Sequence, residues 1–137
     1  MGVIVDTSNL ITAERGRYAV AGLLERIRQK WGESAAGISA VTITELSHGI
    51  ERAKTEEQRQ WRKTFLRDLR AVMKVHPVTD EITERAGAIS GQQAQRGVVL
   101  PFADLMIGAT ALHHGCEVIT ENVRHFEMIP GLVVKKR

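Results

Sequence analysis

Several acidic residues follow short apolar runs of this sequence, at the points where those runs end. Asp6 directly follows GVIV, and Glu121 directly follows EVIT. Glu45 comes a few residues after ISAV, and Asp104 stands inside VVLPFADLMI. Carboxylates in such positions can accept protons, bind cations or cap the helix that follows. What they do depends on whether the folded chain brings them together.

If the folded chain brings these carboxylates close together, they would favour binding of a metal ion. Like charges within a few ångströms repel, so either their pKa values rise and they take up protons, or a cation neutralises them. Cys116 is the single cysteine, and no pair of histidines stands at metal-ligand spacing near the acids. Ligands made only of oxygen point to Mg²⁺ or Mn²⁺ rather than to zinc. Such an ion, with its bound waters, suits in-line attack on a phosphodiester.

Each acid also has a purely structural explanation. Capping of the following helix is the favoured explanation for an isolated aspartate placed as Asp6 is. Thr42 and Glu45 match the reciprocal capping box, which would put Glu45 on the first helical turn. Pro101 suits a helix start, and Asp104 would then lie near the positive end of the helix dipole. No acid taken alone decides between structure and chemistry.

The elements that must position these acids alternate along the chain. Apolar runs predict short buried strands at residues 3–5, 38–41, 75–78, 117–119 and 132–134. Helical spacing of apolar residues between the runs, as for Leu23, Ile27 and Trp31, predicts helices. The alternation indicates an α/β domain with a mainly parallel sheet covered on both faces. The carboxyl ends of parallel strands meet at one edge, so the acids there should converge.

Length and composition agree with a globular protein. The chain has 137 residues, so a single domain over residues 1–137 is expected. Hydrophobic residues make up 43% and charged residues 26%, which excludes a disordered or fibrous chain. A net charge of +3 is compatible with nucleic acid without requiring it. The apolar stretch 97–103 is too short to cross a bilayer, and no Lys or Arg precedes Arg15 as in a secretory signal, so a cytoplasmic protein is expected.

Four motifs together resemble the PIN-domain family, and specifically the VapC toxins of bacterial toxin–antitoxin pairs. They are VIVDTSNLI, AVTITELSHGI, DLMIGATAL and VITENVRHFEMIPGLVV, and they run almost from end to end of the chain. Each is only moderately specific alone, but their order in a chain of this length makes a chance likeness improbable. The resemblance implies a three-layer α/β/α sandwich with a central, mainly parallel five-stranded sheet.

The resemblance also implies a function and partners. It predicts a Mg²⁺- or Mn²⁺-dependent endoribonuclease that cuts transfer RNA or ribosomal RNA and leaves a 5′-phosphate and a 3′-hydroxyl. A VapB-type antitoxin would keep the enzyme silent, and DNA would be contacted only through that antitoxin. A homodimer is expected. The main alternative is a catalytically silent PIN-like scaffold that binds RNA or a partner.

The motifs assign roles to individual residues by resemblance. Asp6, Glu45 and Asp104 match the family's first three acids, as metal ligands and catalytic residues. At the fourth place Asn122 stands where the simplest pattern has an acid, and Glu121 precedes it, so either residue could serve there. Hydroxyl partners of the metal shell or contacts to substrate are expected at Thr7, Ser8 and Thr120.

Basic residues and histidines offer further candidates. Arg15 and Arg17 follow the Asp6 segment and are predicted to border the acidic pocket and contact substrate. A basic helix face is more simply a solvated surface than an RNA track; it carries Arg59, Arg62, Lys63, Arg67, Arg70 and Lys74. His125 could contact phosphate without acting as a base.

Two other enzyme classes fit the sequence poorly. A haloacid-dehalogenase-like phosphatase also begins with a strand that ends in Asp, but it needs a second acid where this chain has Ser8. A receiver domain needs an early acidic pair and a lone aspartate after a middle strand, and neither is apparent.

Overall fold

A five-stranded parallel sheet with the order β3-β2-β1-β4-β5 forms the centre of the fold. The computed structural model describes residues 2–32 and 36–136, so Met1 and Arg137, the ends of the expected domain, lie outside the described residues. The strands are β1 (Val3–Val5), β2 (Ala36–Ser39), β3 (Lys74–His76), β4 (Glu117–Thr120) and β5 (Val134–Lys136). The predicted α/β sandwich with a central, mainly parallel sheet of five strands is confirmed.

Seven helices within the described part of the chain connect and cover the strands. They are α1 (Thr7–Arg15), α2 (Val20–Trp31), α3 (Ala40–Glu51), α4 (Glu56–Val72), α5 (Asp80–Ala94), α6 (Phe102–His114) and α7 (Val123–Glu127). The alternation of side chains along a strand sends Ile4 to one face of the sheet and Val3 and Val5 to the other. Helices α5, α6 and α7 cover the first face, and α1, α2 and α4 cover the second.

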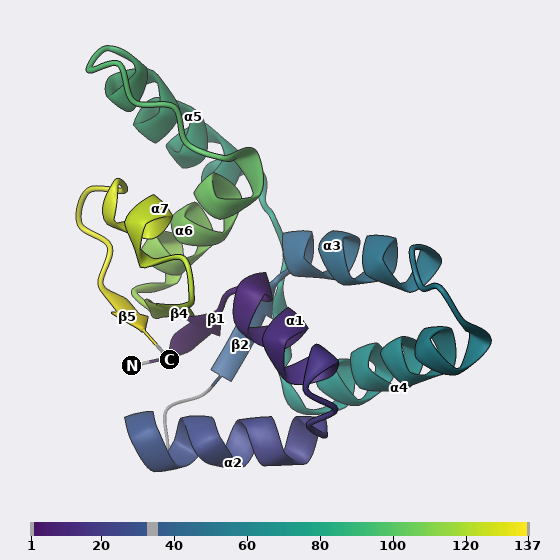
Figure 1. Ribbon diagram of the computed structural model, residues 1–137. Helices are drawn as coiled ribbons and strands as arrows, with labels where there is room; N and C mark the ends of the chain where they lie inside the picture. Colours follow the sequence, from purple (N-terminus) through teal and green to yellow (C-terminus); the bar gives the residue numbers. More distant parts are fainter. Residues whose placement is uncertain (1, 33–35, 137) are drawn as a thin grey trace.

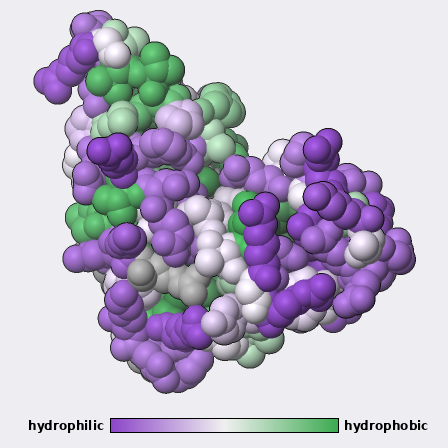
Figure 2. Space-filling model, viewed as in Figure 1, coloured by the Kyte–Doolittle hydropathy of each residue, from purple (hydrophilic) through white to green (hydrophobic). Residues whose placement is uncertain are grey.

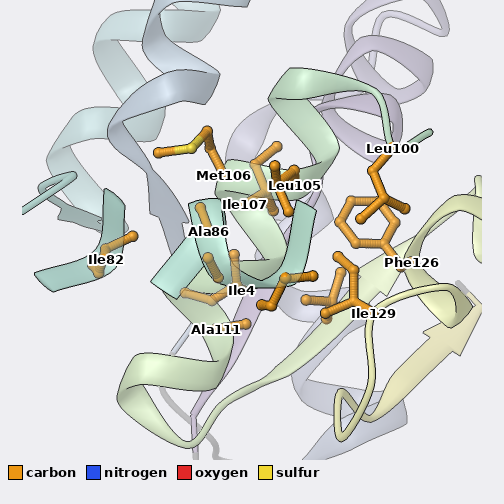
Figure 3. Close-up of a cluster of buried hydrophobic side chains, with 13 residues drawn as sticks. Ile4, Ile82, Ala86, Leu100, Leu105, Met106, Ile107, Ala111, Phe126 and Ile129 are labelled. Carbon is orange, nitrogen blue, oxygen red and sulfur yellow. The ribbon is translucent and has the colours of Figure 1, made fainter. Parts of the chain in front are cut away.

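The face under α5, α6 and α7 holds a large cluster of buried apolar side chains (Figure 3). Ile4 and Val118 of the sheet meet Ile107 of α6 and Phe126 of α7 there. Gly108 of α6 faces Ile129, whose Cδ1 would lie 2.3 Å from an added Cβ. Gly108 therefore lets the segment after α7 pack closely against α6.

The second face includes a helical hairpin that projects from the sheet. Figure 1 shows α3 and α4 extending to one side, with α1 between the hairpin and β1. Arg62 of α4 donates to the Glu14 carboxylate at 3.2 Å and to the Gly49 carbonyl at 2.6 Å, and therefore ties α4 to both α1 and α3. Trp61 adds a bond from its indole N–H to the Glu14 carbonyl at 3.0 Å.

The start of α3 corrects one sequence prediction. Residues 38–41 were expected to be a strand and Thr42 to cap the next helix, but β2 ends at Ser39 and α3 begins at Ala40. The Ser39 hydroxyl caps the helix by accepting from the Val41 N–H at 3.2 Å. Glu45 therefore lies in the second helical turn, and the capping box is not formed.

Other element ends shift by one or two residues from the sequence prediction. Strand β3 covers Lys74–His76 rather than 75–78, β4 extends through Thr120, and β5 covers Val134–Lys136 rather than 132–134. Helix α6 ends at His114, because Gly115 adopts the left-handed conformation that terminates helices. None of the helices in the described ranges is both long and apolar enough to cross a membrane.

Candidate active site

Asp6 lies at the centre of the sheet edge, where β1 ends. It stands at the N-cap position of α1, but its side chain makes no capping hydrogen bond. Instead, Oδ2 accepts two hydroxyl hydrogen bonds, from Ser8 at 2.7 Å and from Thr120 at 2.8 Å. With only 2% of its surface exposed, Asp6 is fixed in place by these donors. The capping explanation for Asp6 is therefore wrong.

The same two hydroxyls close the corner between β1 and β4. The Ser8 hydroxyl accepts the backbone N–H of Glu121 at 3.1 Å, and the Thr120 hydroxyl accepts that of Asn122 at 2.8 Å. The chain after β4 is thereby held against the start of α1. Each hydroxyl uses its one proton on Asp6 and its lone pair on the backbone, so the corner is satisfied.

Glu45 reaches the same edge from α3. The Thr7 hydroxyl donates to its Oε1 at 2.7 Å, and the Thr7 and Thr42 hydroxyl oxygens lie 2.9 Å apart. Because Thr7 has given its only proton to Glu45, Thr42 donates to Thr7. The hydroxyls of Thr42 and Thr7 therefore form a hydrogen-bonded chain that orients the Glu45 carboxylate, and Thr7 is the residue next to Asp6.

Asp104 comes from the first turn of α6, as the sequence predicted. Its Oδ2 lies 2.7 Å from Nδ1 of His125, which belongs to α7. An ionised carboxylate can only accept, so the ring donates from Nδ1. The helix dipole of α6 adds favourable potential at this position.

The three carboxylates are close enough to influence one another's protonation. Burial raises the pKa of Glu45 above its usual value; the Thr7 hydrogen bond opposes the rise, and the charges of Asp6 and Asp104 add to it. Burial also raises the pKa of Asp104, the His125 bond opposes it, and the Asp6 charge adds to it. The structure therefore brings together the three principal acids that the sequence singled out.

The donor set fits a hard divalent cation. Each carboxylate bonds the protein through one oxygen, while the other oxygen has no hydrogen-bond partner among the described residues: Oδ1 of Asp6, Oε2 of Glu45 and Oδ1 of Asp104. Oxygen donors of this kind suit Mg²⁺ or Mn²⁺. Within residues 2–32 and 36–136, no group of three or more acid, His or Cys side chains is arranged to hold a metal ion.

The two candidates for the fourth position lie at the rim of this cluster. Glu121 and Asn122 both have exposed side chains, and the structure records only backbone roles for them in the corner. Both line a hollow with Arg124, His125 and Lys136. Neither side chain joins the carboxylates in the structure.

The two predicted substrate arginines differ in position. Arg15 lines a small apolar cleft of about 60 Å³ that Glu45 also lines. Arg17 instead faces Glu57 at 3.7 Å and lies over the Trp61 ring, 5.2 Å from its centroid. Much of the basic face of α4 is engaged in ion pairs, through Arg59 with Glu51, Arg62 with Glu14 and Arg67 with Asp68. These pairings favour the interpretation of that face as structural.

Two residues of the site escaped sequence reasoning. Thr42 was assigned to a cap, although it sends its hydroxyl toward Thr7. His125 was treated as a possible phosphate contact and was not connected with Asp104. Its only signal was its position in VRHF, shortly after the strand that carries Thr120.

Comparisons with known proteins show the family to which the chain belongs. The PIN domain family matches residues 3–131. Ribonuclease VapC1 of Rickettsia felis is 32% identical over 136 residues, which cover 98% of this chain and 95% of that protein. The tRNA(fMet)-specific endonuclease VapC of Salmonella typhimurium is 30% identical over 137 residues, covering 96% of this chain and 95% of that protein.

A solved structure is similar over the whole fold. The crystal structure of DNA-bound VapBC from Salmonella typhimurium superposes with a TM-score of 0.83 at 24% sequence identity. The match covers 99% of this chain and 98% of that chain. The arrangement of sheet and helices is thus shared with that protein.

Proposed function

This chain belongs to the PIN domain family and to its VapC ribonucleases, and on that premise we propose that it is a metal-dependent endoribonuclease acting as the toxin of a toxin–antitoxin pair. The observation that carries the proposal is the convergence of Asp6, Glu45 and Asp104, each with one oxygen free of protein hydrogen bonds. A scaffold that only binds would have no need for such a repulsive cluster.

The ligands of the ion would be Asp6, Glu45 and Asp104, with Mg²⁺ or Mn²⁺ as the metal. When bound, the ion supplies positive charge that offsets the charge growing on the scissile phosphate and makes the attacking water more acidic. Glu121 and Asn122 stand at the rim, where either side chain can approach a water or the substrate. We assign the fourth position to this pair.

The chain's own residues have distinct tasks in this proposal. The hydroxyls of Ser8 and Thr120 hold Asp6, and Thr7 holds Glu45. Burial and neighbouring charge raise the pKa of Glu45, which suits it to accept a proton from the attacking water. His125 orients Asp104. The products would be a 5′-phosphate and a 3′-hydroxyl.

The substrate and partners are proposed from the relatives. We infer that transfer RNA is the substrate class, since one relative is named as specific for tRNA(fMet), with ribosomal RNA as the second candidate. A VapB-type antitoxin would inhibit the enzyme, and promoter DNA would be bound through it, as the solved VapBC assembly is DNA-bound. Cellular RNA as substrate implies a cytoplasmic enzyme. Arg15, beside Glu45, is the better placed of the two predicted substrate arginines.

Cleavage by the purified protein tests the proposal. Free of any co-purifying partner, the protein should degrade transfer RNA with Mg²⁺ or Mn²⁺ and stop when EDTA is added. Sequencing of RNA 5′ ends after induction in cells would identify the cleavage site. Binding of RNA without any metal-dependent cleavage would favour the silent scaffold instead. The expected homodimer stays a prediction, which light scattering on the purified protein tests.

A further inference from the structure

A basic hollow of about 350 Å³ lies between α1 and the turn of the α3–α4 hairpin. Four of its lining residues are cations and none is an acid; the lining is Arg15, Arg52, Lys54, Gln58 and Arg62. Arg52 directly follows the last residue of α3, and Lys54 lies in the turn before α4. The visible end of the hairpin is covered by hydrophilic residues (Figure 2). The hollow is therefore open to solvent and positively charged.

Most of this positive charge is not neutralised by the protein. The neighbouring acids are paired with other cations: Glu51 with Arg59, Glu57 with Arg17 and Glu14 with Arg62. Arg15, Arg52 and Lys54 form no ion pair with any residue that the structure describes. Unpaired cations around a concave surface concentrate anions from solution.

The hollow adjoins the catalytic region. The small apolar cleft that Glu45 lines shares Arg15 and Arg62 with the hollow. Its remaining walls come from α1, α3 and α4, and include Ile11, Leu46 and Phe65. The basic hollow and the cleft of Glu45 therefore adjoin each other at Arg15 and Arg62.

On the basis of the ribonuclease function proposed above, we propose that this hollow binds backbone phosphates of the RNA substrate next to the segment that is cut. Arg52 and Lys54 are its phosphate contacts. An RNA that presents a phosphodiester to Asp6, Glu45 and Asp104 necessarily has further phosphates tethered close by. The hollow is a basic surface that adjoins the cleft of Glu45, so the reaction itself supplies an anion of the right kind.

RNA binding in the presence of EDTA tests this inference without any cleavage. Fluorescence anisotropy would measure the affinity of the full chain for labelled oligouridylate and for transfer RNA over a range of salt concentrations. The test variant is Arg52→Gln with Lys54→Gln. The matched control is Arg85→Gln with Arg96→Gln, which removes two exposed, unpaired charges near α5. Thermal melting would check that both variants stay folded.

Loss of two phosphate contacts should weaken binding and make it less dependent on salt. The slope of log K against log salt should fall by about 1.4 for the test variant and stay unchanged for the control, since each contact to a single strand contributes about 0.7. The ratio of the wild-type affinity to the affinity of the test variant should then fall about sevenfold when the salt concentration is raised fourfold.

Three outcomes would overturn the inference. The test variant could bind RNA as wild type does, or both variants could weaken equally, which would indicate diffuse charge. The third outcome is that polyglutamate binds wild type more tightly than RNA and loses this binding in the test variant; the hollow would then receive an acidic protein. A wild-type protein that binds RNA through the hollow but never cuts it would refute the proposed function alone.

Discussion

The end of β1 and the first turn of α6 each bring an aspartate to the site, but they hold it in different ways. Asp6 is almost fully buried and accepts from two hydroxyls, those of Ser8 and Thr120. Asp104 is half-buried and has a single side-chain partner, His125. The first aspartate is held redundantly, whereas the second depends on one contact between two helices.

This difference suggests a division of labour in the site. Asp6 belongs to the hydrogen-bonded corner of the sheet and keeps its orientation as long as the sheet is intact. The orientation of Asp104 follows the packing of α6 against α7 and can adjust when an ion or substrate arrives. The fixed acid would thus locate the ion, and the adjustable one would complete its shell.

Removal of the charge of Asp6 or of Asp104 should have the largest effect on RNA cleavage, and it tests whether cleavage needs both acids. Asp6→Asn and Asp104→Asn should each lower RNA cleavage at least about a thousandfold, because the ion's charge stabilisation is worth several kcal/mol. Gel-based cleavage with Mn²⁺ measures the loss. Asp80→Asn, which changes an exposed acid at the start of α5, is the control. Undiminished turnover by either variant would remove the metal role from that residue.

Removal of one hydrogen-bond donor from each aspartate tests whether Asp6 is held redundantly and Asp104 is not. His125→Leu takes away the only side-chain partner of Asp104 and should lower cleavage and Mn²⁺ affinity roughly 10- to 100-fold. His125→Asn, whose amide can replace the Nδ1 donor, should recover most of the loss. Ser8→Ala leaves the Thr120 donor on Asp6 and should cost less than His125→Leu. Titration calorimetry measures the Mn²⁺ affinities. A larger loss of affinity for Ser8→Ala than for His125→Leu would contradict the idea that Asp6 is held redundantly.

The packing of α6 can be disturbed without touching the site. Gly108→Val would push a side chain into Ile129 and should lower the free energy of unfolding by about 2 kcal/mol. Gly87→Ala lies in the middle of α5 with open space around it and should instead stabilise the protein by about 1 kcal/mol. Urea denaturation measures both changes. Equal effects of the two substitutions would mean that Gly108 is not a close-packing position.

The smallest expected effect is a dependence of folding stability on pH. The pKa values of Glu45 and Asp104 are raised by burial and by neighbouring negative charge, so the folded protein binds protons there more tightly than the unfolded chain does. These groups therefore make the metal-free protein less stable as pH rises from the ordinary carboxyl pKa through the raised values. Thermal melting in EDTA should show the decline, and Glu45→Gln with Asp104→Asn should flatten it. An unchanged slope in that double variant would contradict this origin.

Much of the fold could be predicted from the sequence, because buried strands and amphipathic helices leave periodic patterns. Strand β1 was predicted correctly, and the PIN-domain resemblance is confirmed by the family match. The start of α3 was missed, because Ser39 and Thr42 are both good caps and only the tertiary structure selects between them. Helix ends are decided by such local competition.

The site was predictable only in part. An acid that directly follows a central strand lies at the carboxyl edge of the sheet, so Asp6 could be singled out from the pattern. The partners of the site's acids depend on how helices cross. The contact between Thr7 and Glu45 and that between His125 and Asp104 join distant segments whose relative orientation no local pattern encodes.

The bond between Thr120 and Asp6 joins residues 114 positions apart in the chain. On the ribosome, β1 is translated first, yet its neighbour β4 follows only when most of the polypeptide has been synthesised. Until then the first aspartate lacks the strand that holds it, and long-range pairings of this kind form late in folding. A nascent chain therefore carries Asp6 before the hydrogen-bonded corner that orients it has formed.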